Sequence, residues 1–493
     1  MSEEIDQPKS SDGVHNKESA NSPLPKEKVS VTKHTMVLHD QEFPYTATTG
    51  LMHLRNVKEK KTASIFYVAY VRDEIEDQAA RPITFCFNGG PGSCSVWLHL
   101  GAYGPKRIDM VDGVMPKPNR AQLIDNDCTL LDLTDLVFID PIGTGFSRAG
   151  EAGQAEDFFG VDGDADSVCQ FIQRYLSQNH RWASPKFLSG ESYGTTRAGT
   201  MAHRLQTQGV ALNGLILISL AINFQTFIFD LGNDLPYLMF LPTFTAVAWH
   251  HGMLPDDIGS DLDTLLVEVR NWAFDVYAPA LMRGSSLSDH HRQEIARQLS
   301  RYTGLEISEI LNLDLRIADM RFSKSVLKQP GWTVGRMDGR YRGHDTDRDH
   351  RRTQRDPSID APMAPYTGLI NDHIRRTLNF EHESTYDIFN MKANAKWKWS
   401  RKGRLGYPDT SDELRQAMIS NPHLKILFAN GLYDLATPFF GAEYTADHLE
   451  LDAQLRDNII LTYYPAGHMM YFHRESHQAL KADIVTLYQK ALD

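Results

Sequence analysis

The stretch Gly190-Glu191-Ser192-Tyr193-Gly194 lies between a short apolar run, residues 185–189, and a helix-like segment from Thr195 to Gln208. A G-x-S-x-G sequence between a strand and a helix is typical of a nucleophile elbow, in which two glycines allow a sharp turn that exposes the serine hydroxyl. The same pattern also occurs by chance as an ordinary glycine turn with an exposed serine. A nucleophilic serine needs partners, so the remaining sequence decides between the two interpretations.

The composition favours a soluble globular protein with a large core. The chain has 493 residues, of which 41% are hydrophobic and 23% are charged. Its net charge of -12 argues against nucleic acid as a main partner, because phosphate binding needs a basic surface. There is no uninterrupted apolar stretch of roughly 18 residues, so we expect no transmembrane helix and no membrane partner. The oligomeric state is not predicted.

The first 29 residues are rich in Ser, Glu, Lys, Asn and Pro and contain no apolar h-region. We therefore expect a disordered tail over residues 1–29 rather than a signal peptide, and a cytoplasmic location. The four cysteines are widely spaced and form no C-x-x-C motif, which favours free, mostly buried thiols; they are Cys86, Cys94, Cys128 and Cys169.

The segment 30–223 alternates between strand and helix patterns. Antiparallel strands are predicted over 30–54 and a further strand over 64–71, and the compact apolar runs 82–87 and 136–139 suit strands buried on both faces. Apolar residues recur at helical spacing from Ala165 to Asn179. The elbow strand and its helix follow, and then another apolar run, 214–222. This order predicts an α/β fold with a mainly parallel central sheet.

From residue 224 to 402 the periodicity becomes mostly helical, with helices expected at 264–274 and 289–302, which predicts an inserted helical cap. The α/β pattern resumes over 403–493, with a helix at 412–419, strands at 424–429 and 458–464, and a closing helix. Inside the cap, residues 336–356 are strongly charged. Asp345, Asp347, Asp349 and Asp356 match a calcium-loop register, but His350 stands where the loop needs glycine and three arginines offset the charge. We interpret this stretch as a solvated charged loop and expect no metal.

Asp434 and His468 are the candidate partners of Ser192. Each directly follows the C-terminal end of a predicted strand, and the chain order Ser, Asp, His is the one found in α/β-hydrolases. Singly, Asp434 could be a turn residue and His468 a satisfied loop histidine. The three positions together predict a triad in which His468 is the base and Asp434 orients it.

The oxyanion of a tetrahedral intermediate needs backbone donors. The N–H of Tyr193, directly after the nucleophile, is one candidate. The other lies in the turn Asn88-Gly89-Gly90-Pro91-Gly92; because Pro91 has no N–H, the donor is Gly90 or Gly89. The alternative for this turn is a purely structural tight turn, and it lacks the Lys-Ser/Thr element of a phosphate loop.

Four motifs together resemble those of the serine carboxypeptidases: Asn88 to Gly92, Asp140 to Ser147 (Asp-Pro-Ile-Gly-Thr-Gly-Phe-Ser), Gly190 to Gly194, and Gly467-His468-Met469. The resemblance implies an α/β-hydrolase with a helical cap that releases C-terminal residues from peptides through an acyl-enzyme, without a cofactor. It implies Ser192 as nucleophile, with Gly90 and Tyr193 as the oxyanion hole.

The same resemblance implies that Asn88 and Glu191 hold the terminal carboxylate of the substrate, with Gly89 and Met469 as further substrate-binding residues. Two carboxyl groups share such a site only when Glu191 is protonated.

Three departures from the family pattern concern this recognition and the compartment. Ala102 stands where the family usually has a glutamate, so the usual partner of the recognition glutamate is missing, and we expect a weaker acidic pH optimum. Cys86 replaces a frequent tryptophan. Ser93 replaces a cysteine, with Cys94 displaced by one, so the secretory disulfide is unsupported and the chain looks like a non-secreted, bacterial-type member.

The sequence thus predicts a serine carboxypeptidase-like hydrolase acting on peptides. An esterase or acyltransferase with the same triad is the nearest alternative, favoured by Ala102, and a non-catalytic binding protein on the same scaffold is a further one. Side-chain specificity is not predicted, because the cap and flanking loops set it.

Overall fold

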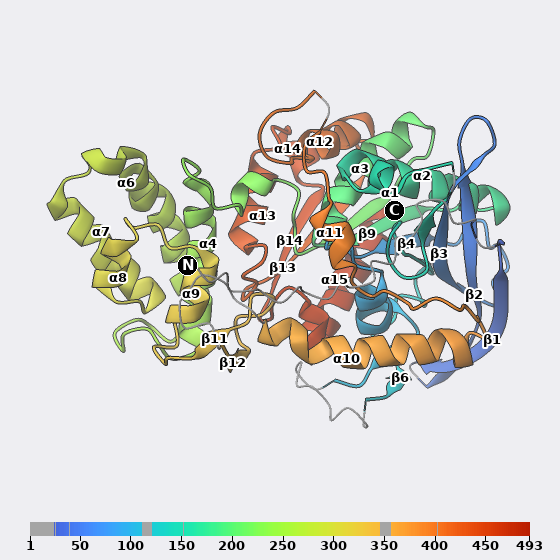
Figure 1. Cartoon of the computed structure of the whole chain (residues 1–493), viewed down its shortest axis with the longest axis horizontal. Coiled ribbons are helices and arrows are strands. Elements are labelled where there is room, and N and C mark those ends of the chain that lie inside the picture. Colours follow the sequence, from blue (N-terminus) through green and yellow to red (C-terminus); the bar gives the residue numbers. More distant parts are fainter. Residues whose placement is uncertain are drawn as a thin grey trace, which may run out of the picture.

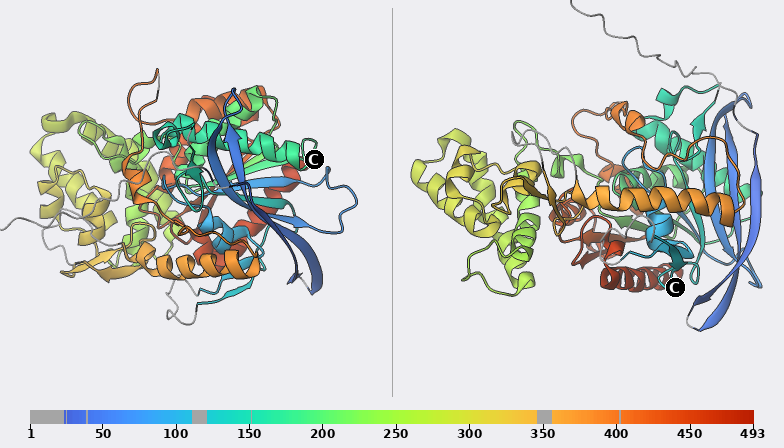
Figure 2. Two further views of the ribbon diagram at one scale, coloured as in Figure 1. Left: turned by 45° about the vertical axis from the view of Figure 1, so that its right-hand side comes forward. Right: turned by 60° about the horizontal axis from the view of Figure 1, so that its bottom comes forward.

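A computed structural model describes residues 24, 26–38, 40–110, 121–150, 152–345, 356–401 and 403–493. A mixed sheet forms its centre, in the order β1-β2-β3-β7-β4-β9-β10-β13-β14, with β8 paired to β3 (Figures 1 and 2). The antiparallel part comprises β1 (Val29–Leu38), β2 (Gln41–Arg55), β3 (Lys61–Arg72) and β8 (Arg148–Ala149). The parallel part comprises β7 (Asp135–Ile139), β4 (Ile83–Phe87), β9 (Lys186–Glu191), β10 (Gly214–Ile218), β13 (Lys425–Gly431) and β14 (Ile459–Tyr464). The prediction of a mainly parallel α/β-hydrolase sheet is confirmed.

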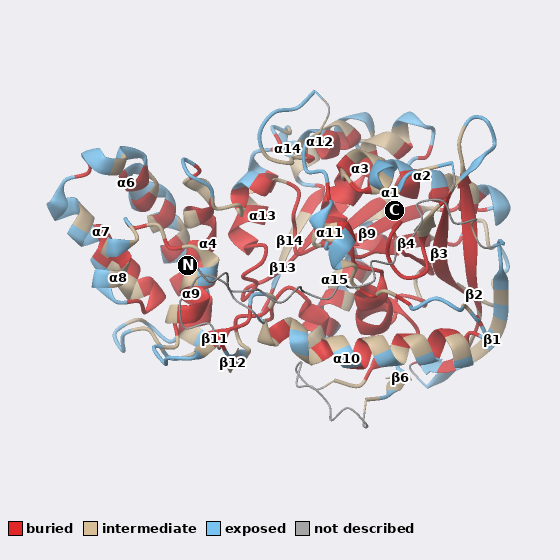
Figure 3. Ribbon diagram, in the orientation of Figure 1, coloured by how far each residue is buried: buried red, intermediate tan, exposed pale blue. Residues whose placement is uncertain are grey.

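The parallel strands are buried on both faces, as their continuous apolar runs predict. All five residues of β4 and of β7 are buried, and alternate residues enter different cores: Phe85 and Phe87 pack on one side of the sheet and Cys86 on the other. Figure 3 shows this buried centre inside more exposed outer helices.

Helices cover both faces of the sheet. One core packs against α2 (Val161–Gln178), α3 (Tyr193–Thr207) and α12 (Ser411–Ser420), and the other against α15 (Arg474–Leu492), α10 (Pro357–Asp372) and the π-helical turn η1 (Leu98–Tyr103). The remaining short elements around this body are α1 (Ala155–Phe158), α11 (Met391–Ala395), α13 (Phe439–Asp447), α14 (Ala453–Arg456), η2 (Phe224–Thr226), η5 (His373–Thr377), η6 (Met470–Phe472), and the hairpin β5 (Lys106–Ile108) with β6 (Leu123–Asp125).

The inserted segment contributes to several hydrophobic cores. A separate hydrophobic core holds the helices on the left of Figure 1, which are α4 (Leu235–His250), α5 (Leu262–Trp272), η3 (Ala273–Tyr277), α6 (Ala278–Arg283), η4 (Gly284–Ser286), α7 (Asp289–Thr303), α8 (Ile307–Asn312) and α9 (Asp319–Ser325). The hairpin β11 (Trp332–Val334) with β12 (Arg342–His344) follows them. From α10 onward the segment packs on the sheet instead, through Tyr366, Ile370 and Phe380. The predicted cap limits of 224 and 402 stay a prediction.

Several local expectations are resolved by the described residues. All four cysteines are free and buried, as predicted. None of the described helices combines the length and apolarity required to span a bilayer. The expected disordered tail and most of the calcium-register stretch, including Asp347, Asp349 and His350, lie outside the described residues. Asp356 caps α10 by accepting from Ser358 N at 3.0 Å, and Asp345 pairs with Lys324 at 3.0 Å.

Candidate active site

The predicted site residues lie at the carboxyl ends of neighbouring parallel strands. Ser192 follows β9, the Asn88 turn follows β4, Asp434 follows β13 and His468 follows β14. Since these strands run in the same direction, their following loops meet at one edge of the sheet, which is where α/β folds bind ligands.

Ser192 occupies a strained turn between β9 and α3. Its φ of 59° and ψ of -130° are unusual for a residue with a side chain, and its backbone N–H donates to Ile218 O at 2.9 Å. Backbone strain of this kind persists only where the surrounding structure enforces it. The two flanking glycines provide the space: a Cβ at Gly190 would lie 2.3 Å from Gly194 O. The geometry is that of a nucleophile elbow.

His468 and Asp434 form a buried pair. His468 Nδ1 and Asp434 Oδ2 are 2.7 Å apart, and both side chains are almost fully buried. Burial lowers the pKa of His468, but the Asp434 carboxylate and its hydrogen bond outweigh that effect, so the pKa lies above its usual value. With Nδ1 held by Asp434, Nε2 is the ring nitrogen left to act as a base.

Thr437 completes the orientation of Asp434, and the sequence did not single it out. Its backbone N–H donates to Asp434 Oδ1 at 3.0 Å and its hydroxyl to Oδ2 at 2.8 Å, while Ala436 N–H donates to Oδ1 at 2.8 Å. These donors fix the carboxylate that faces His468. The short spacing from Asp434 was the available signal, because a residue three positions after an aspartate commonly meets its side chain in a turn.

The two predicted oxyanion donors belong to turns that touch each other. Gly90 has a φ of +103°, and a Cβ on its neighbour Gly89 would lie 2.5 Å from Tyr193 N. Within the described residues, neither Gly90 N–H nor Tyr193 N–H donates a hydrogen bond to another group. Tyr193 is also the first residue of α3, so the positive end of the helix dipole adds to the field at this point.

Asn88 and Glu191 are directly joined. Asn88 Nδ2 donates to Glu191 Oε1 at 2.9 Å, and Asn88 Oδ1 accepts from Leu98 N at 3.1 Å, which fixes the amide orientation. Burial raises the pKa of Glu191 to about 7, although His468, Tyr471 and Asn88 act in the opposite direction. A second donor, Tyr471 OH, lies 2.7 Å from Glu191 Oε2.

These groups surround one cavity of about 490 Å³. Every predicted site residue lines it except Asp434, which lies behind His468. Aromatic residues form the wall beside Tyr193, where the rings of Phe224 and Trp399 are 5.1 Å apart. No sequence motif predicted this apolar lining, which is formed by Phe224, Phe227, Ile228, Phe389, Met391 and Trp399.

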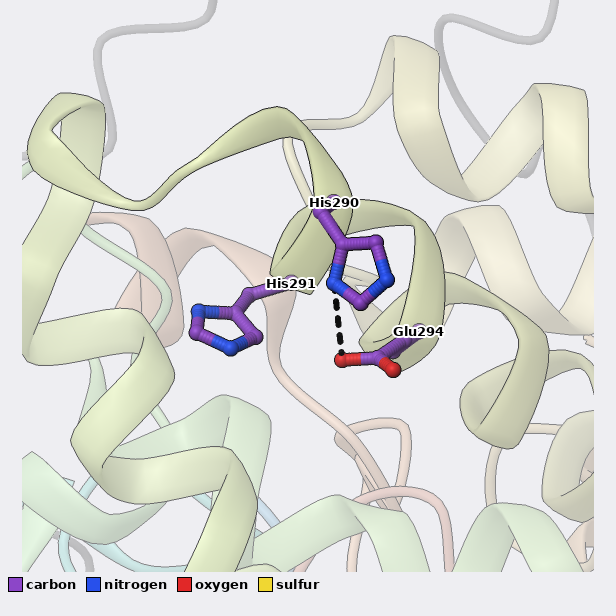
Figure 4. Close-up of side chains that lie close together, drawn as sticks. All are labelled: His290, His291 and Glu294. Carbon is purple, nitrogen blue, oxygen red and sulfur yellow. Dashed lines mark ion pairs between the residues drawn. The ribbon is translucent and has the colours of Figure 1, made fainter.

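Two other features of the cap do not involve these residues. A larger hollow of about 760 Å³ contains acid–base pairs such as Arg321–Glu309 and Lys324–Asp345. On α7, His290, His291 and Glu294 place possible metal-binding atoms within 4.8 Å of one another, and Figure 4 shows His290 beside Glu294. All three are exposed, and His290 is already paired with Glu294 at 3.4 Å.

Similar proteins identify the family to which this chain belongs. A family model described as serine carboxypeptidase matches residues 39–460. The chain belongs to the serine carboxypeptidase family. Two similar relatives from Arabidopsis thaliana are serine carboxypeptidase-like 5, 26% identical over 157 residues, and serine carboxypeptidase-like 46, 23% identical over 291 residues. These matches cover 31% and 56% of this chain, and only 33% and 54% of the relatives' own lengths.

A solved structure shares the fold of this serine carboxypeptidase family member. It is Kex1(delta)p, a prohormone-processing carboxypeptidase from Saccharomyces cerevisiae, with a TM-score of 0.55, 16% identity, and coverage of 90% of this chain and 91% of that one. Neither the plant relatives nor the yeast structure tests the expected bacterial, non-secreted character or the cytoplasmic location, which stay predictions.

Proposed function

We propose that this protein is a serine carboxypeptidase that releases C-terminal residues from peptides through an acyl-enzyme. The observation that carries the proposal is a single cavity lined by Ser192, by His468 with its bound Asp434, and by the Asn88–Glu191 pair. The first three residues supply covalent chemistry, and the pair supplies a place for a carboxylate.

In the proposed reaction, His468 Nε2 removes the Ser192 proton as Ser192 Oγ attacks the last peptide carbonyl. Gly90 N–H and Tyr193 N–H stabilise the resulting oxyanion. The C–N bond then breaks as His468 returns its proton to the departing amine, and water hydrolyses the acyl-enzyme with His468 again as base. Each step uses the pairing that holds His468 against Asp434.

The Asn88–Glu191 pair would recognise the free carboxylate of the departing residue, which requires a protonated Glu191. The reaction therefore needs neutral His468 and neutral Glu191 together. The kcat/KM for free-carboxylate peptides should rise as His468 deprotonates and fall as Glu191 ionises near its pKa of about 7. For substrates without a terminal carboxylate, kcat/KM should not fall as Glu191 ionises.

The aromatic wall suggests the side chains accepted on the acyl side. Asn88 and Glu191 would hold the leaving residue, and Phe224, Phe227 and Trp399 line the same cavity, so we assign these aromatic residues to the acyl side. A wall of this kind favours large apolar or aromatic side chains before the scissile bond. The same apolar character keeps an esterase or acyltransferase activity as the second candidate.

A peptide mixture analysed by mass spectrometry tests the proposal, with free and C-terminally amidated versions of each peptide. We expect shortening from free C-termini, most for peptides with an apolar penultimate residue, and covalent labelling of Ser192 by a serine-directed phosphonate. Ser192→Ala should reduce kcat/KM by about 10⁴-fold or more. Ester turnover that exceeds peptide turnover and is indifferent to amidation supports the second candidate, whereas no turnover and no label contradict both.

A further inference from the structure

Both oxygens of the buried Glu191 carboxyl have a side-chain donor. Asn88 Nδ2 reaches Oε1 at 2.9 Å and Tyr471 OH reaches Oε2 at 2.7 Å, while Glu191 is only 3% exposed. A carboxyl group with a hydrogen bond at each oxygen has a fixed orientation. Its remaining donor and acceptor positions therefore point in fixed directions. Because Glu191 lines the cavity, that capacity is available to a bound molecule.

Tyr471 is itself held in one position. It lies in the short turn η6, three residues after His468, and its side chain is 4% exposed. Its ring meets the Phe472 ring edge-on, with centroids 5.3 Å apart. Position 101 must be glycine for this arrangement, because a Cβ there would lie 2.7 Å from Tyr471 Cε2.

Gly101 of η1 therefore provides the space that the tyrosine needs. Ala102 is fully buried, and its carbonyl is used elsewhere, accepting from Asn126 Nδ2 at 2.9 Å and from His477 Nε2 at 2.8 Å. Because position 102 is alanine, the glutamate that the family usually has at this position is absent. A phenol from the histidine loop contacts Glu191 instead.

We propose that Tyr471 is the positioning residue for substrate recognition, holding Glu191 against Asn88 so that its free hydrogen-bonding capacity meets the C-terminal carboxylate of a peptide. This inference rests on the proposed function and adds to it a residue and a pH limit. A phenol is a donor, and it favours the ionised form of Glu191, whereas a second carboxyl in the same place would favour the protonated form.

The pH limit follows from the groups around Glu191. Burial raises its pKa, Asp434 acts in the same direction, and His468, Tyr471 and Asn88 oppose them. The titratable groups that face Glu191 are His468, Asp434, Tyr471, Tyr366 and Tyr103. Removing the Tyr471 hydroxyl removes one donor to the carboxylate, so the pKa of Glu191 rises and Glu191 stays protonated to a higher pH.

Tyr471→Phe tests this with a matched pair of substrates, a blocked dipeptide with a free carboxylate and its methyl ester. For the free-carboxylate substrate, we expect KM to rise several-fold and the alkaline limb of kcat/KM to move up by about one pH unit, the effect of losing one hydrogen bond to a charged group. The ester profile should keep its wild-type shape. Tyr175→Phe is the control, because Tyr175 is 3% exposed, as buried as Tyr471, and its hydroxyl makes no hydrogen bond to Glu191 within the described residues.

The inference is overturned if Tyr471→Phe lowers kcat/KM equally for both substrates and leaves the pH profiles unshifted, because Tyr471 would then contribute only packing. A readout independent of turnover separates it from the proposed function. Infrared difference titration of the Glu191 carboxyl, assigned with Glu191→Gln, should give a higher pKa in Tyr471→Phe than in the wild type. Equal pKa values overturn the inference even in an active enzyme, and a shifted pKa in an inactive protein supports the contact while contradicting the proposed peptidase.

Discussion

At the scale of single residues, the candidate site depends on backbone atoms brought unusually close together. Gly89 shows this most directly, since its missing side chain lets the Asn88 turn touch the start of α3. A Cβ at Gly89 would lie 2.5 Å from Tyr193 N and 2.6 Å from Gly194 N, which are backbone atoms that cannot move aside. Arg197 reinforces the contact, donating to Asn88 O at 2.7 Å while paired with the buried Asp164 at 2.7 Å.

We expect Gly89→Ala to separate the two proposed oxyanion donors. The kcat/KM should fall by about 10²-fold or more, the effect of losing an oxyanion contact, and unfolding should become easier by about 1–3 kcal/mol through overpacking. Steady-state kinetics and denaturant unfolding measure the two effects. Gly368→Ala is the control, because that helical glycine faces open space and alanine there should not destabilise α10. Unchanged kinetics in Gly89→Ala would contradict the assigned oxyanion hole.

Residues that belong to a short local motif could be assigned a role from the sequence. Ser192 between its glycines, and His468 and Asp434 directly after apolar runs, are visible because strand ends can be recognised locally. Tyr471 could not be assigned in this way. Its partner lies 280 positions away, and a tyrosine in an apolar turn predicts only a packed ring.

At the scale of elements, the loop between β11 and β12 holds the loops that carry His468 and Asp434. His468 N–H donates to Met337 O at 2.6 Å, Gly467 N–H to Asp338 Oδ2 at 3.0 Å, and Gly339 N–H to Tyr433 O at 2.9 Å. Arg340 adds a bond to Pro465 O at 3.0 Å. The histidine loop is therefore fixed from the inserted segment as well as from β14.

Asp338→Ala should loosen this attachment. Without the carboxylate that holds Gly467, His468 samples positions away from Ser192, and we expect kcat to fall by about tenfold to a hundredfold with a smaller change in KM. The matched control is Asp447→Ala, which removes an exposed ion pair with Arg456 that does not contact the histidine loop. A lowered melting temperature with unchanged kcat would restrict Asp338 to a structural role.

The contacts of the β11–β12 loop show why the strands of the sheet are easier to predict from sequence than the loops. Strands 83–87 and 135–139 are formed by runs of apolar residues that can be recognised directly in the sequence. Residues 336–356 were predicted as a solvated charged loop, yet Asp338 is 7% exposed and contacts Gly467, 129 positions away. The many charged residues of this stretch indicated a solvent-exposed loop. The sequence around Asp338 does not indicate its distant partner, Gly467, so its burial could not be predicted.

At the scale of the whole molecule, the hydrophobic core of the inserted helices extends to the residues around Asp434. The hydrophobic core of α4 to α9 also includes Leu432, Tyr433 and Leu435, the residues on either side of Asp434. Two further cores lie on opposite faces of the sheet and carry the strands before Ser192 and Asn88. Packing in these three larger cores thus sets the relative positions of the nucleophile, the base and its carboxylate.

Burial in these cores also predicts how the protein responds to acid, and His477 is the test case. It lies in α15, is 3% exposed and is 2.8 Å from Ala102 O through Nε2. Burial lowers its pKa to about 4, and Arg107 and Arg474 act in the same direction, while the Ala102 carbonyl opposes them. Because the folded pKa lies below the unfolded value of about 6.5, the stability contributed by neutral His477 is complete above pH 6.5 and is lost as the pH falls toward 4.

His477→Gln keeps a donor for Ala102 O but cannot take up a proton. The free energy of unfolding of the variant, relative to wild type, should therefore increase by about 2–3 kcal/mol between pH 7 and pH 4, as measured by urea unfolding at several pH values. Glu191 and Asp140, whose pKa values are raised by burial to about 7 and about 6, act in the opposite direction but are common to both proteins, so their effect cancels in the difference. His290→Gln, at a side chain that is 78% exposed, is the control for a histidine-to-glutamine change at the surface. A difference for His477→Gln that stays constant with pH would mean that His477 accepts a proton in the folded protein as readily as in the unfolded chain, and that its burial does not limit stability in acid.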